Sequence, residues 1–118
     1  MTVSNCVFEN STNEAVFCHP TCRNNIIVAG CKFLSCYQGV DLEGVSSGII
    51  TGNAFINCGN PIELYADGVY RPILIQNNYF KDYVYIYFMG DVTFINNVCE
   101  GTGRITTEST NPLKISIS

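Results

Sequence analysis

One six-residue phrase recurs five times in this chain of 118 residues, and this recurrence constrains the fold more than any other feature. The phrase reads apolar, any residue, Gly or Asn, Asn or Cys, any residue, then Phe or Cys. Its copies occupy residues 3–8, 28–33, 50–55, 75–80 and 94–99, so they begin 25, 22, 25 and 19 residues apart. This spacing excludes helical repeats of about 33 residues or more, and abundant β-branched and aromatic residues favour strands.

A unit of about 22 residues fits one coil of a parallel β-solenoid, built from three short strands and three turns. Stacked coils place each residue over its equivalent in the preceding coil, about 4.8 Å away, so recurring residue types become columns. We therefore predict an all-β chain of about five coils that forms a single domain over residues 1–118.

Several columns are predicted to face the interior. The first position of the phrase gives an aliphatic column of Val3, Val28, Ile50, Ile75 and Phe94. The last position gives an aromatic stack of Phe8, Phe33, Phe55 and Phe80, closed by the smaller Cys99. A partial column precedes the phrase and contains Ile26, Ile73 and Val92, with Gly48 as its gap. A second strand in each coil alternates in and out, which directs inward the side chains of Val40, Leu42, Ile62, Leu64 and Ile86.

The fourth position of the phrase forms a polar column inside this apolar pattern. Its members are Cys6, Cys31, Asn53, Asn78 and Asn97. A buried Asn is costly unless its amide is paired, and stacked amides can bond to one another and to turn backbone. The residues just before this column tolerate the positive φ of a tight turn. They are Asn5, Gly30, Gly52, Asn77 and Asn96.

These Asn-Asn-x-Phe turns, inward columns and coil lengths resemble the right-handed parallel β-helix repeats of the pectin-lyase-like superfamily. The resemblance extends from Val3 to about Ile117. It implies a single-stranded, right-handed parallel β-helix and an extracellular, virion or cell-surface location. It also implies a part in a larger polysaccharide-processing, surface or phage-tail protein. Because such repeats serve many activities, the resemblance is more specific for fold than for function.

The two ends of the chain fall at the same phase of the repeat. Val3 enters at the aliphatic column, and Ile115 falls in that column when residues 112–115 are aligned with 72–75. Neither end shows the helix-like cap with which solenoids usually cover their terminal coils. Two hypotheses follow: the chain is a fragment of a longer β-helix, or copies associate end to end into rings or fibres.

Charge and hydropathy exclude some classes of partner. The net charge is −4 and the six basic residues are scattered, which argues against nucleic acid because no basic stripe faces a phosphate backbone. No apolar run approaches the roughly 18 residues that predict a membrane span. The first residues carry no signal-peptide pattern, so the sequence leaves the compartment open.

Seven cysteines are many for this length. Cys36 and Cys58 each follow an anchor Phe by three residues and are expected to stack, as buried thiols that behave like small hydrophobic groups. Cys18, His19 and Cys22 form the one stretch that resembles a metal-ligand set, although a structural zinc site needs a fourth ligand. The alternative for that stretch is an ordinary loop, and we expect no cofactor there.

Two carboxylates occupy equivalent places in adjacent coils. Asp41 follows Phe33 by eight residues and Glu63 follows Phe55 by eight, so both are expected on the outer face, one above the other. Neighbouring acids repel unless they are solvated or bridged by a cation such as calcium.

The same outer face supplies the candidate functional residues. Tyr85 and Thr106 are expected at about the place of Glu63 in later coils, and Arg71 is near in sequence. Asp41, Glu63, Tyr85 and Arg71 are therefore candidates for carbohydrate binding. The resemblance adds calcium and a basic residue that promote elimination from uronic acids, although the motifs of such lyases are missing from the sequence.

The predicted function is a non-catalytic module that is structural, carbohydrate-binding or both. The alternative is a lyase or hydrolase of acidic polysaccharide that uses Asp41 and Glu63 as its acid–base pair. Five short coils leave little room for the walls of a cleft.

Overall fold

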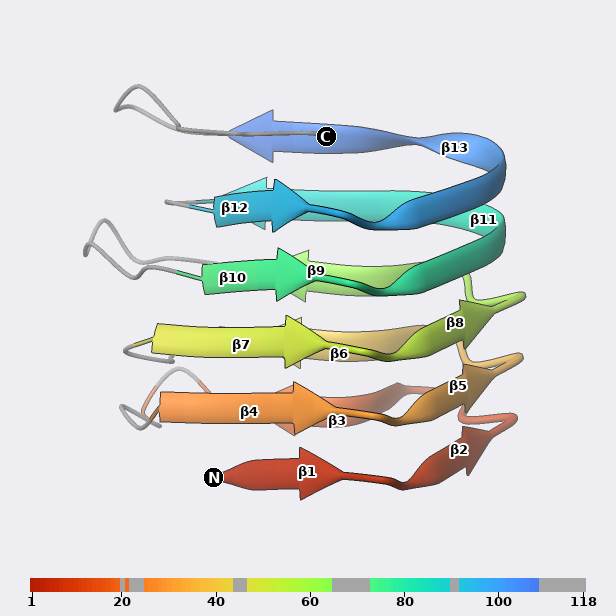
Figure 1. Cartoon of the computed structure of the whole chain (residues 1–118). Coiled ribbons are helices and arrows are strands. Elements are labelled where there is room, and N and C mark those ends of the chain that lie inside the picture. The colour runs from red at the N-terminus through yellow and green to blue at the C-terminus, as the bar shows by residue number, and fades with distance from the viewer. Residues whose placement is uncertain (20, 22–24, 44–46, 65–72, 90–91, 109–118) are drawn as a thin grey trace.

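The computed structural model describes residues 1–19, 21, 25–43, 47–64, 73–89 and 92–108 (Figure 1). It confirms an all-β parallel solenoid, with no helix among the described residues. The solenoid makes about four turns, against the five coils expected. The difference is small, because the five predicted copies of the phrase are five successive passes of the chain, and five passes enclose four full turns.

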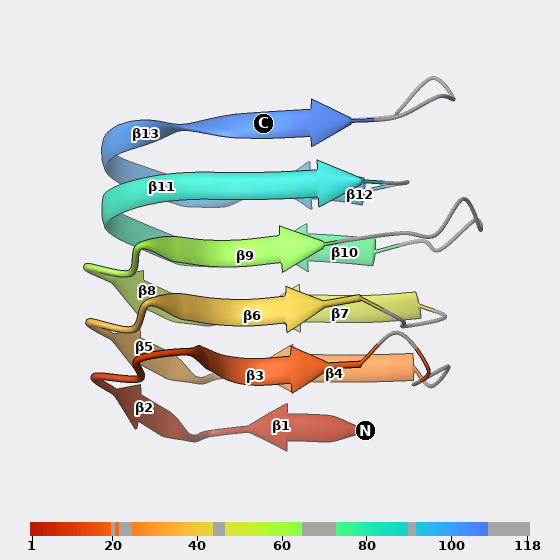
Figure 2. The ribbon, with the colours of Figure 1, turned by 180° about the vertical axis from the view of Figure 1, so that it is seen from behind.

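Two parallel sheets form the walls of the solenoid. The first sheet contains, in spatial order, β1 (Thr2–Ser4), β4 (Asn25–Ala29), β7 (Ser47–Thr51), β10 (Ile73–Gln76) and β12 (Val92–Ile95). The second sheet begins with the short strands β2 (Val7–Glu9), β5 (Lys32–Leu34) and β8 (Ala54–Ile56). It bends into β3 (Glu14–Cys18), β6 (Gln38–Leu42) and β9 (Asn60–Leu64), which face the viewer in Figure 2. In the last two passes single long strands, β11 (Tyr79–Met89) and β13 (Val98–Glu108), cover both parts.

Two series of positive-φ residues recur along the solenoid, most of them between strands, although Asp82 and Gly101 lie within β11 and β13. The first lies between the two sheets, at the five positions predicted for it: Asn5, Gly30, Gly52, Asn77 and Asn96, with φ of 54, 65, 65, 57 and 56°. The second was not predicted and lies two residues after each anchor Phe or Cys: Asn10, Ser35, Asn57, Asp82 and Gly101. Small or hydrogen-bonding side chains dominate both series because they tolerate the left-handed region.

The core consists of columns in strict register. Val3 pairs with Val28, Val28 with Ile50, Ile50 with Ile75, and Ile75 with Phe94. The predicted inward residues of the second strands, Val40, Leu42, Ile62, Leu64 and Ile86, are all buried. Gly48 forms the predicted gap in its column, and the side chains of Ile26 and Ile73 fill it: a Cβ built on Gly48 would lie 3.1 and 3.0 Å from them.

Four phenylalanine rings stack along the axis of the solenoid. The centroids of Phe8, Phe33, Phe55 and Phe80 are separated by 5.0, 4.7 and 5.0 Å, and their planes are within 11° of parallel. Parallel coils impose this geometry, because equivalent side chains in register can only lie one over another. Each ring in the middle of the stack is therefore covered on both faces.

The asparagine amides connect four successive coils through hydrogen bonds. Asn78 Oδ1 accepts the backbone N–H and the Nδ2 of Asn53, both at 3.0 Å. Its Nδ2 donates to the carbonyl of Ile50 at 2.9 Å and to Oδ1 of Asn97 at 3.1 Å. Asn53 Oδ1 likewise accepts the backbone N–H of Cys31 at 2.9 Å. The ladder thus pairs buried amides that would otherwise destabilise an apolar interior.

Candidate functional site

The outer face of the second sheet gathers the polar and aromatic side chains that the sequence selected. One outward column runs, in register, through Phe17, Asp41, Glu63, Tyr87 and Thr106. Two residues before Tyr87 and Thr106 on the same two strands, Tyr85 pairs with Arg104. Both of these side chains also face outward. The stacking of Asp41 against Glu63 is therefore as expected.

The tyrosine equivalent to Glu63 is not the one predicted. Tyr87 occupies that place, and Tyr85 lies two residues before it. The prediction was wrong here because β11 passes without a break through the position where β8 and β9 are separated by a corner. That corner changes the number of residues between the anchor Phe and the outward column, so a fixed offset from the anchor fails in this coil.

A shallow depression of about 290 Å³ lies over the strands β9, β11 and β13. Its lining consists of Asn60, Glu63, Tyr85, Ile86, Tyr87, Arg104 and Thr106. Tyr85 is 42% exposed, Arg104 is exposed, and Glu63 is half-buried. The depression therefore combines two aromatic rings with a carboxylate, a guanidinium and an amide, on three adjacent strands of a rigid sheet.

Asp41 was expected on the solvated outer surface, and the structure shows it only 3% exposed. It lies on an inner strand of the sheet, between Phe17 on β3 and Glu63 on β9, and every residue of β6 is buried. Alternation correctly gave the direction of its side chain, but the direction alone did not determine its access to water.

Burial has a strong electrostatic consequence for Asp41. Loss of solvation, followed by repulsion from Glu43, Glu63 and Glu14, raises the pKa of Asp41 from 3.8 to about 7. Its Oδ1 has no hydrogen-bond partner among the described residues. This position favours the neutral form of the carboxyl group more than an exposed position does, and it leaves little of the group accessible to a molecule at the surface.

The remaining candidates are placed as follows. Cys18 is buried in line with Leu42, and the Nδ1 of the exposed His19 lies 3.0 Å from Oγ1 of Thr21. Cys22 and Arg71 lie outside the described residues. No group of three or more His, Cys, Asp and Glu side chains within the described ranges could hold a metal ion.

Sequence reasoning missed Asn60, Tyr87 and Arg104 as members of the site. All three were visible as residues of the second strands, and Arg104 is the only basic residue in that strand of its coil. Counting inward columns first, and assigning outward residues from them, would have found Tyr87 beside Glu63.

Comparisons with known proteins add no name to this site. No protein-family model matches the chain, and neither the curated proteins nor the solved structures contain a match. Within the described residues, no helix has the length and apolar character needed to cross a membrane.

Proposed function

We propose that this protein is a non-catalytic carbohydrate-binding module built on a right-handed β-helix of the pectin-lyase-like type. The observation that carries the proposal is the depression where Tyr85 and Tyr87 lie beside Glu63 and Arg104. Tyrosine rings supply an apolar face for a sugar ring, and charged or amide groups beside them bind hydroxyls.

The burial of Asp41 favours binding over catalysis. A glycosidase or lyase needs an acid and a base that both reach the substrate. Asp41 is 3% exposed, so of the two predicted catalytic carboxylates only Glu63 is accessible from the depression. A rigid face with one accessible carboxylate supports sugar contact without turnover.

Affinity electrophoresis through gels that contain single polysaccharides, neutral and acidic, tests the proposal. We expect at least one polysaccharide to retard the protein, with no release of unsaturated or reducing ends. Tyr85→Ala should weaken binding about three- to tenfold, the range for loss of one aromatic contact. Tyr37→Ala is the matched control, because Tyr37 is an exposed tyrosine away from the depression.

Two results would contradict the proposal. One is unchanged mobility in every gel. The other is retardation that Tyr85→Ala and Arg104→Ala leave intact, because the bound sugar would then lie elsewhere. Steady release of sugar products that Glu63→Gln abolishes would establish the enzyme alternative instead.

A further inference from the structure

Two cysteines, one in the first pass of the chain and one in the second, lie one over the other. The strands before and after them, β1 beside β4 and β2 beside β5, keep one constant register, so Cys6 is the counterpart of Cys31. The backbone N–H of Lys32 donates to the carbonyl of Cys6 at 2.9 Å, which shows the same register at the cysteines themselves. Equivalent Cα atoms on neighbouring parallel strands are about 4.8 Å apart, and a disulfide spans about 4.4–6.8 Å. The backbone therefore meets the first requirement for a bond between the two residues.

The two thiol groups share one orientation at this bend. Each lies against the carbonyl oxygen two residues before it, with Cys6 Sγ 3.2 Å from that of Ser4 and Cys31 Sγ 3.5 Å from that of Ala29. Cys31 Sγ also lies 3.7 Å from the carbonyl oxygen of Val3, which belongs to the first pass. Both sulfur atoms are thus beside consecutive carbonyl groups of β1, and Cys31 Sγ is turned toward the pass that carries Cys6.

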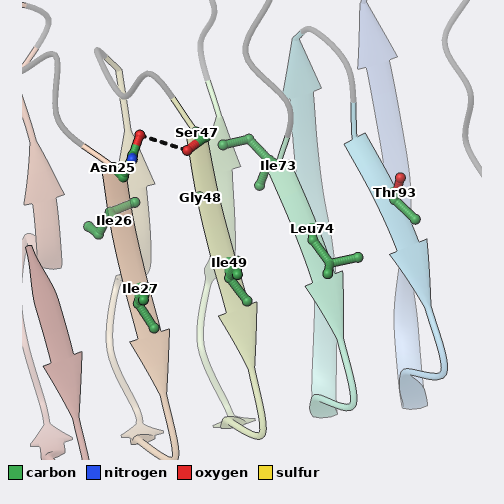
Figure 3. Close-up of a pocket in the computed structure, with 9 residues that line it drawn as sticks. All are labelled: Asn25, Ile26, Ile27, Ser47, Gly48, Ile49, Ile73, Leu74 and Thr93. Atoms are coloured by element: carbon green, nitrogen blue, oxygen red, sulfur yellow. Dashed lines mark hydrogen bonds between the residues drawn. The ribbon is translucent and has the colours of Figure 1, made fainter.

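The first pass is less constrained than the passes that follow it. Among the described strands, β1 and β2 are outermost in their sheets, and each pairs on one side only. Later strands are held on both sides: in Figure 3, Ile27, Ile49 and Leu74 form an aliphatic row on β4, β7 and β10, each of which has two neighbours. Cys6 is exposed, whereas Cys31 is 1% exposed. The pair therefore joins an accessible thiol on an edge pass to a buried thiol on the next.

A second cysteine pair has the same spacing but differs in both respects. Cys36 lies beside Cys58 on the next pass, since the backbone N–H of Gly59 donates to the carbonyl of Cys36 at 3.0 Å. Both cysteines are buried, and both follow strands, β5 and β8, that have a neighbour on either side. Loss of solvation, the largest cause, raises the pKa of the Cys58 thiol to about 11, so little of it is the thiolate that attacks a disulfide. This second pair serves as a control for register alone.

We propose that Cys6 and Cys31 form a disulfide bond when the folded chain meets a small-molecule disulfide such as oxidised glutathione. The Cys6 thiolate attacks one sulfur of that molecule, which forms a mixed disulfide and releases one small thiol. Cys31 then loses its proton to solvent and attacks Cys6 Sγ, which forms the bond between the two cysteines and releases the second small thiol. Two protein thiols are oxidised, and one small disulfide is reduced to two thiols.

The bond joins two passes across 25 residues of sequence, so it restricts the unfolded chain and fixes the first pass onto the second. It lies on other passes than the proposed glycan site, which is formed by β9, β11 and β13, and the two proposals are independent.

Mass spectrometry of the folded protein after incubation with oxidised glutathione, at low protein concentration, tests the proposal. Cleavage after Glu9, Arg23 and Lys32 leaves Cys6 and Cys31 each as the one cysteine of its peptide. We expect these two peptides to be joined, with Cys36 and Cys58 still present as thiols. The midpoint of urea unfolding should rise in the oxidised chain and return to its former value after treatment with dithiothreitol.

Two variants show the order of the steps. Cys31→Ser should stop at the mixed disulfide on Cys6, and Cys31→Ala replaces it if circular dichroism shows that the serine variant does not fold. Cys58→Ser is the control and should form the bond as the unaltered chain does. Three results would overturn the proposal: a mixed disulfide on Cys6 that never resolves in the unaltered chain, a Cys36–Cys58 bond that forms as fast, or a Cys6–Cys31 bond that fails to raise the urea midpoint.

Discussion

Asp41→Asn should change how the stability of this protein depends on pH. The carboxyl group is buried among Glu43, Glu63 and Glu14, which raises its pKa from 3.8 to about 7. Below pH 3.8 the group is protonated in both the folded and the unfolded chain, and its burial then carries no ionic penalty. As the pH rises toward 7, the unfolded chain releases this proton while the folded chain retains it, so the free energy of unfolding falls.

The size of the effect follows from the two pKa values. The gap between 3.8 and about 7, at about 1.4 kcal/mol per pKa unit, gives a loss on the order of 4 kcal/mol when the transition is complete. Local relaxation reduces this figure, so it is an upper limit. Asparagine keeps the shape of the side chain without its charge. At acidic pH the free energy of unfolding of the variant should therefore lie about 1 kcal/mol below that of the unaltered chain, because the amide hydrogens lack partners. Above pH 7 it should exceed that of the unaltered chain.

Urea unfolding of both proteins, at a series of pH values on either side of the interval from 3.8 to 7, measures the difference. Subtracting one curve from the other isolates Asp41, because the other carboxylates are common to both. Glu9→Gln controls for the loss of one formal charge at an exposed place on β2. Parallel curves for the unaltered chain and Asp41→Asn across that interval would refute the reasoning, as would an equal gain in Glu9→Gln.

Three further predictions follow from the interior and the turns. Asn78→Ala should lower the free energy of unfolding in urea titrations by about 3 kcal/mol or more, because four hydrogen bonds are lost and their buried partners remain unpaired. Asn97→Ala, at a half-buried position, should lower it less. Gly52→Ala should lower the free energy of unfolding by about 1 kcal/mol, which is the strain of its positive φ alone. Gly101→Ala should lower it clearly more, because the added Cβ would collide with the carbonyl of Asp82. Equal losses in the two variants would show that backbone strain alone decides. Cys6 is exposed and should react with a thiol reagent in the folded protein. Cys58 is fully buried, and its pKa is raised to about 11, so it should react only on unfolding. Mass spectrometry of the labelled peptides measures both reactions.

The sequence was sufficient to predict the columns because a parallel solenoid makes position in the repeat equivalent to position in space. Once five copies of the phrase are aligned, Val28, Ile50 and Ile75 must lie over one another, and the structure has them in register. The first turn series could be predicted for the same reason, since Gly or Asn recurs there in every copy. The second series was missed because its members, such as Ser35 and Asp82, share tolerance of positive φ but little chemistry.

The candidate site was less predictable because it depends on neighbours rather than on the period. The burial of Asp41 is set by what lies beside it on other coils, and alternation along one strand does not contain that information. The place of Tyr87 depends on whether a corner interrupts the strand, and no single residue type marks that interruption. Outward positions also escape the packing constraint that keeps the inward columns uniform.

This difference between inward and outward positions explains how one solenoid can carry two unrelated surfaces. The inward columns fix the backbone of every coil, so outward residues can vary without changing the register. On one side they supply tyrosines, a carboxylate and a guanidinium over β9, β11 and β13, and on the other an uncharged aliphatic row over β4, β7 and β10. Because the rigid core separates these faces, a substitution on one should leave the other intact. Ile49 is 38% exposed on the first sheet, so Ile49→Glu should bind polysaccharide as the unaltered chain does. Loss of polysaccharide binding in Ile49→Glu would show that the two faces do not act independently.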